Sequence, residues 1–142
     1  MLPAPLRLYF ENPAGRVFEQ PAGRRDGYVV VEHGAGPRHF GEVQTLLGYA
    51  KRLLALRGWH KLLGDQRHMV PFTADEQHWV TALWLNTPHQ GHRALLGAVV
   101  LPAPVYAGLP PSLAEGSARA SAMTYRLFAA LAPARAWLLA PG

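Results

Sequence analysis

Histidine is the residue type in this sequence with the widest chemical scope, because a neutral imidazole binds metals and transfers protons near neutral pH. The chain has seven histidines, and the spacing of His89 and His92 brings two of them close together. A zinc site needs a third and usually a fourth protein ligand. The spacing supplies none, since cysteine is absent and Asp75, Glu76 and His78 belong to a different predicted element. We therefore predict no metal site and no cofactor.

Asp75 and Glu76 are adjacent carboxylates, but neighbouring residues of a helix point about 100° apart, which does not suit a catalytic acid/base pair. Both follow Thr73, which has the spacing of a capping box with Glu76 at the start of a helix, where carboxylates are favoured. The sequence has no phosphate-binding glycine loop, nucleophile elbow or cysteine nucleophile. We predict no catalytic residues, and expect that the protein is not an enzyme.

Four side chains are candidates for contact with a ligand or partner. Asp65, Arg67 and His68 follow a predicted strand, and Tyr106 lies in the loop after the next strand. Open α/β sheets bind ligands outside the carboxyl ends of their strands. An ion pair between Asp65 and Arg67 that fixes the loop is the alternative role for those two residues.

The first third of the chain predicts β-structure. Leu6, Leu8 and Phe10 alternate with other residues, as on the buried face of a strand. Turn residues at 11–15 then predict a hairpin with the strand that follows, and a β-branched run at 28–32 predicts a third strand.

Two helices are predicted in the middle of the chain. Apolar residues at helical spacing predict a long helix from His39 to Arg57, ended by Gly58. A short buried strand follows it. The second helix begins at the capping box of Thr73 and ends near Asn86.

The last third alternates strands and helices. Residues 94–101 are apolar on both faces and predict a central strand covered by helices on each side. Helix is predicted at 112–123, strand at 125–128 and helix at 134–139. We predict an α/β fold with a mixed, mainly parallel sheet, an N-terminal β-hairpin and helices packed on the sheet. The four tryptophans are predicted to belong to the core: Trp59, Trp79, Trp84 and Trp137.

Length and composition limit the classes of protein. A chain of 142 residues fits one domain over residues 1–142, and 49% hydrophobic residues suit a folded protein. The net charge of +5 comes from scattered basic residues without a nucleic-acid-binding motif, so no nucleic acid is expected as a partner. The sequence has neither a secretory signal nor a long apolar run, and we predict a cytoplasmic protein without membrane insertion.

Several segments in succession resemble the SpoIIAA-like, STAS-related domains of bacteria. They are Tyr28-Val29-Val30-Val31-Glu32, Lys61-Leu62-Leu63-Gly64-Asp65-Gln66-Arg67, Asp75-Glu76-Gln77-His78-Trp79-Val80, Gly97-Ala98-Val99-Val100-Leu101, Arg126-Leu127-Phe128 and residues 134–138. The resemblance covers about residues 28–139 and leaves 1–27 as a hairpin extension. It implies a small sheet with helices that binds partners or ligands without performing chemistry. The Asp-Ser-Ser-Gly type motif of phosphorylated members is absent, so we do not expect a phosphoswitch.

Two functions remain open on these grounds. The first is a non-catalytic protein-interaction or regulatory module, with an unknown protein partner and with homodimer formation undecided. The second is a carrier or sensor of a small apolar or anionic ligand, which the Trp and Leu content of the helices and the positive net charge favour.

Overall fold

The computed structural model describes residues 5–85, 94–114, 116–120 and 123–140. In this part of the chain, seven strands form one sheet in the order β1-β2-β3-β4-β5-β7-β6. The strands are β1 (Arg7–Asn12), β2 (Gly15–Pro21), β3 (Gly27–His33), β4 (Lys61–Asp65), β5 (Leu95–Val100), β6 (Ser117–Ala120) and β7 (Met123–Phe128). The helices are α1 (Phe40–Arg57), α2 (Ala74–Leu85), α3 (Ala103–Ala107), α4 (Pro111–Ala114) and α5 (Leu131–Leu139).

The sheet is mixed. β1, β2 and β3 form an antiparallel meander, which contains the predicted N-terminal hairpin, and β6 pairs antiparallel with β7. β3, β4, β5 and β7 are parallel neighbours. The α/β class and the hairpin are thus confirmed. The prediction that parallel pairing predominates is not confirmed, because the described strands form three parallel and three antiparallel pairs.

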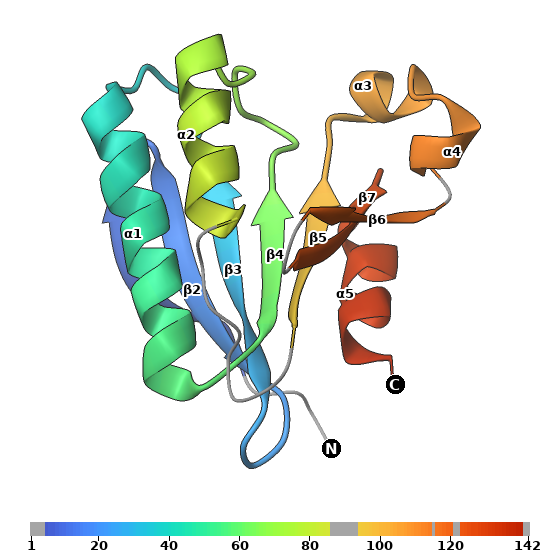
Figure 1. Cartoon of the computed structure of the whole chain (residues 1–142). Helices are drawn as coiled ribbons and strands as arrows, with labels where there is room; N and C mark the ends of the chain where they lie inside the picture. Colours follow the sequence, from blue (N-terminus) through green and yellow to red (C-terminus); the bar gives the residue numbers. More distant parts are fainter. Residues whose placement is uncertain (1–4, 86–93, 115, 121–122, 141–142) are drawn as a thin grey trace.

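Helices cover the two faces of the sheet unequally. Successive strand residues point to opposite faces, so Val29 and Val31 belong to the core under α1 and α2, while Val30 belongs to the core under α5. Figure 1 shows α1 and α2 side by side, and α3 and α4 beyond the arrowhead of β5. The carboxyl ends of the central strands therefore lie at the same end of the sheet as α3 and α4.

The predicted buried face of the first strand is correct for Phe10 and wrong for the two leucines. Leu6 and Leu8 are 40% and 52% exposed, whereas Tyr9 and Phe10 both pack against the core under α1. The register shifts between Leu8 and Phe10, as in a β-bulge. Because an extra residue reverses the alternation of side chains, the bulge turns the leucines outward.

The helix predicted at 112–123 is also wrong for most of its length. Helix α4 covers only Pro111–Ala114, and Ser117–Ala120 form strand β6. Alanine has the highest helix propensity, but the register of β6 along β7, with Ser117 opposite Arg126, supplies backbone hydrogen bonds to an edge strand instead. Tertiary pairing here overrides local preference.

The predicted C-terminal end of α1 and the predicted start of α2 are confirmed. Gly58 follows α1 in the left-handed conformation with φ of 68°, and α2 begins directly after Thr73. The Thr73 hydroxyl accepts a hydrogen bond from the Glu76 backbone N–H at 3.1 Å, and the Glu76 carboxylate accepts one from the Thr73 backbone N–H at 2.9 Å. The capping box is therefore complete.

Replacing Thr73 with alanine is expected to lower the free energy of unfolding by about 1 kcal/mol, because the Glu76 N–H loses its acceptor. Thr73→Ser is the matched control, since it retains the hydroxyl, and its urea midpoint is expected to stay close to that of the wild type. Equal midpoints for the alanine variant and the wild type would show that the cap contributes nothing.

Candidate functional site

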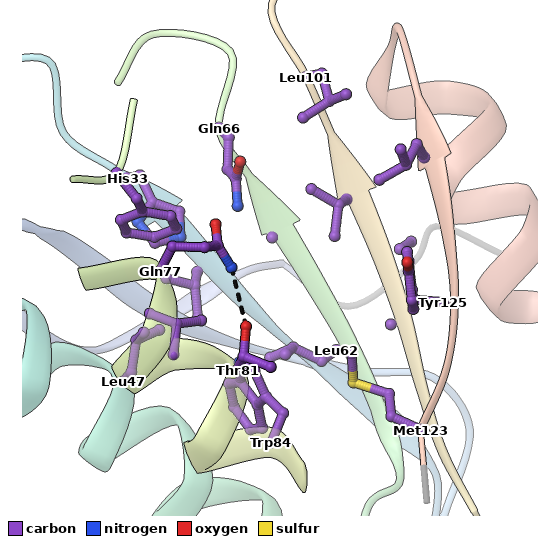
Figure 2. A pocket seen from close by; sticks show the side chains of 18 residues that line it. His33, Leu47, Leu62, Gln66, Gln77, Thr81, Trp84, Leu101, Met123 and Tyr125 are labelled. Carbon is purple, nitrogen blue, oxygen red and sulfur yellow. Dashed lines mark hydrogen bonds between the residues drawn. The ribbon is translucent and has the colours of Figure 1, made fainter. Parts of the chain in front are cut away.

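A cavity of about 420 Å³ lies between α2 and the sheet. Its floor is the face of β3, β4, β5 and β7 that also carries α1 and α2, and side chains of α2 form one wall (Figure 2). The volume falls within the range of about 300–1,000 Å³ that is typical of small-molecule sites. None of the described residues that line it is an acid, a lysine or an arginine.

Two glycines open the floor of this cavity. Gly64 in β4 and Gly97 in β5 both line it, next to Leu62 and Val99. A Cβ atom added at Gly64 would meet no atom within 4 Å, so a side chain there would project into empty space. The sequence predicted helices over both faces of β5; α5 covers one face, and the other face lines the cavity.

The polar side chains of the lining are concentrated toward one end of the cavity, although Thr81 and Tyr125 also line it. His33, Gln66 and Gln77 converge near the carboxyl ends of β3 and β4, whereas Leu62 and Met123 lie toward the opposite end (Figure 2). The Gln77 amide donates a hydrogen bond to the Thr81 hydroxyl at 3.2 Å. The cavity can therefore orient a molecule that has one polar and one apolar end.

His33 is the most buried polar side chain of the lining, at 7% exposure. Burial and then the nearby charge of Arg38 lower the pKa of its imidazole to about 4, against the opposing effects of Asp65 and Glu76. The ring meets the edge of the Phe72 ring, with centroids 5.5 Å apart. Within the described ranges it has no hydrogen-bond partner, so a neutral imidazole with two unpaired nitrogens faces the cavity.

Arg38 fixes the amino end of α2 beside the cavity. Its guanidinium donates two hydrogen bonds to the Glu76 carboxylate, at 2.8 and 3.0 Å, and two more to the carbonyls of Val70 and Pro71. Hydrogen bonds from Arg38 outweigh the effect of burial and, with those from Thr73, lower the pKa of Glu76 to about 2. Glu76 is thus a structural anion, and its charge is neutralised at the site.

The predicted contact residues lie at the expected end of the sheet but outside the cavity. The Gln66 N–H donates to the Val100 carbonyl at 2.8 Å, which joins the carboxyl ends of β4 and β5. Asp65 alternates with Gly64, so its side chain points to the opposite face from the cavity. Tyr106 donates its hydroxyl hydrogen to the Ala114 carbonyl at 2.7 Å and so ties α3 to α4. His68 is exposed.

Asp65 and Arg67 form the ion pair that was the alternative prediction. The guanidinium donates to both carboxylate oxygens at 3.0 Å, and the Arg67 backbone N–H donates at 3.1 Å. Burial raises the pKa of the Asp65 carboxyl, but these hydrogen bonds outweigh it, and the pKa lies below its ordinary value. The pair holds the turn after β4.

The described residues contain no group of three or more histidines and acids that could hold a metal ion. His89 and His92 lie outside the described residues. Asp75 is exposed, while Glu76 is occupied by Arg38. Of the four tryptophans, Trp59 is buried in the core as predicted, and Trp84 belongs both to the core and to the cavity wall.

Comparison of the chain with protein-family models, with curated proteins and with solved structures gives no significant match. Among the helices that the structure describes, none combines the length and the apolar character needed to cross a membrane.

Proposed function

We propose that this protein is a non-catalytic binding domain that holds a small, uncharged and mainly apolar molecule between α2 and the sheet. The observation that carries the proposal is the cavity of about 420 Å³ whose described lining has no charged side chain. Such a domain acts as a carrier or a sensor. The lining also lacks carboxylate, lysine and cysteine side chains among its described residues, which supports a role in binding rather than in chemistry.

The charge of the lining decides between apolar and anionic ligands. A charged ligand in a largely apolar cavity loses its hydration, and it needs an opposite charge or several hydrogen bonds in return. Arg38, at the amino end of α2, already pairs with Glu76, and both side chains are less than 10% exposed. An anion therefore gains little here, and a neutral ligand is favoured.

An interaction module is the second candidate, and β1 supports it. β1 is an edge strand of the described sheet, and Leu8 within it and Leu6 just before it are exposed. Exposed apolar edge strands pair readily with a strand of another chain. Leu8→Lys is expected to abolish capture of a protein partner, or a concentration-dependent dimer, without affecting ligand binding in the cavity.

The resemblance to SpoIIAA-like, STAS-related domains, with their small sheets and binding roles, agrees with both candidates and stays a prediction. A cytoplasmic location likewise stays a prediction from the sequence.

Native mass spectrometry of gently purified protein tests the proposed function. Gly64→Leu is the informative variant, because a Cβ atom there meets nothing within 4 Å and the leucine side chain would occupy part of the cavity. Gly41→Leu is the matched control, since Gly41 is exposed on α1 and a Cβ there also meets nothing within 4 Å. We expect wild type and Gly41→Leu to retain a small molecule that Gly64→Leu has lost. A molecule retained equally by all three proteins would place the site elsewhere.

A further inference from the structure

We propose that the ligand carries a neutral hydroxyl group, which binds His33 at the polar end of the cavity while an apolar body lies over the glycine floor. This inference rests on the proposed function and adds the chemical class of the ligand, an alcohol or phenol.

His33 supplies the first argument. A neutral imidazole offers one N–H donor and one acceptor nitrogen, and this ring has neither paired within the described residues although it is 93% buried. When a ligand displaces water from the cavity, the ring nitrogens lose their solvent partners unless the ligand replaces them. A buried polar group without a partner opposes binding. A wholly apolar ligand is therefore a poor match for this end.

The neighbours of His33 supply the second argument. Gln66 lies at the same end of the cavity, and its side-chain amide has no hydrogen-bond partner among the described residues. Together the imidazole and the amide present both donors and acceptors in a small space. A hydroxyl group both donates and accepts, so one such group can satisfy His33 and Gln66 at once.

Charge excludes the other common polar groups. A carboxylate or phosphate on the ligand would lose its hydration without finding a free cation, because Glu76 already pairs with Arg38. An ammonium group would find no carboxylate in the described lining. The neutral state of His33 adds no charge at neutral pH. The remaining class is a polar group without charge.

The apolar part of the cavity suits a flat body. Gly64 leaves the backbone of β4 open in the floor, while the Met123 side chain lies over Gly97 in β5. The rings of Phe72, Trp84 and Tyr125 contribute to the lining. Aromatic side chains prefer offset or edge contacts with other rings. An aromatic body with a hydroxyl group satisfies both parts of the cavity.

Two probes of equal shape test the inference: p-cresol, which has the hydroxyl group, and toluene with hydrogen in its place. Their dissociation constants are measured by ¹³C-methyl NMR of Met123 for wild type, His33→Leu and Gly64→Leu. We expect wild type to bind p-cresol about fivefold more tightly than toluene, as one neutral hydrogen bond allows. His33→Leu is expected to remove this preference, and Gly64→Leu to remove binding of both probes.

The outcomes separate this inference from the function on which it rests. Equal affinities of the two probes in wild type, or a preference for p-cresol that survives in His33→Leu, would overturn the hydroxyl assignment and leave the cavity as a ligand site. Binding of neither probe, or unchanged binding in Gly64→Leu, would overturn the proposed function itself. If His33→Leu does not fold, Gln66→Leu at the same end provides the same comparison, with the same expected loss of preference.

Discussion

Replacing Arg38 with methionine is expected to lower the free energy of unfolding by about 3 kcal/mol. The guanidinium makes a bidentate pair with Glu76, and the two side chains are 9% and 6% exposed. Removing one partner of a buried pair leaves the other charge without compensation, which costs about 3–5 kcal/mol. We expect the lower end of this range. The Val70 and Pro71 carbonyls also lose hydrogen bonds from Arg38, but these bonds are exposed and water can replace them. Urea denaturation at pH 7 measures the change.

The double variant Arg38→Met with Glu76→Gln is the control for this prediction. Glutamine retains the reach of the capping box toward Thr73 but removes the unpaired charge, so the double variant is expected to be more stable than Arg38→Met alone. Additive losses in the two single variants and the double variant would show that the pair is not coupled. Because Arg38 also fixes α2 beside the cavity, the single variant is expected to bind neutral probes more weakly.

Acidification from pH 7 to pH 4 is expected to destabilise the protein by about 3 kcal/mol through His33 alone. The pKa of this imidazole is about 4 in the folded protein and 6.5 as the ordinary value. Below pH 6.5 the unfolded chain therefore takes up a proton that the folded chain refuses until about pH 4, so stability is full above the first value and falls toward the second. A difference of this size between two pKa values corresponds to about 3 kcal/mol.

His33→Leu isolates this contribution from the other titrating groups. Glu76 and Asp65 also have lowered pKa values, so the stability that they contribute is present above the ordinary carboxyl range and is lost only at lower pH. Between pH 6.5 and 5 the slope of unfolding free energy with pH is expected to be markedly smaller in His33→Leu than in wild type. Identical slopes in the two proteins would mean that His33 is hydrated and titrates normally.

The sequence correctly predicted helix ends that depend only on residues nearby in the chain. Gly58 ends α1 because glycine adopts the left-handed conformation there without steric cost. Thr73 precedes α2 because its hydroxyl accepts a hydrogen bond from the Glu76 N–H. The parallel pairing of β4 with β5 was predicted from the alternation of strands with helices. It brought the predicted strand ends, after Asp65 and after Val100, to one end of the sheet.

Elements decided by distant contacts were not predictable in this way. The bulge in β1 depends on its pairing with β2, and alternation alone could not show that Leu6 and Leu8 face outward. The strand β6 exists because β7 offers it an open edge, against the helix propensity of an alanine-rich segment. In both cases the partner strand decides the conformation.

The predicted contact residues alternate along the chain with residues that do line the cavity. Asp65 and Arg67 were expected to contact a ligand, but the residues that alternate with them, Gly64 and Gln66, line the cavity. A signal was present in the sequence, since glycines inside the apolar strands at positions 64 and 97 are typical of places where another group approaches the backbone. His33 lies two residues after a run of three valines, on the same face of its strand as Val29 and Val31.

The central claim is that the cavity between α2 and the sheet takes up a small neutral molecule. The most direct measurement is a titration of the ¹³C-labelled methyl group of Met123 with toluene and, separately, with benzoate, in wild type and Gly64→Leu. We predict saturable shifts of the Met123 signal with toluene, little or no response to benzoate, and no response of Gly64→Leu to either probe. A response to benzoate as strong as that to toluene, or a toluene response that persists in Gly64→Leu, would contradict the claim.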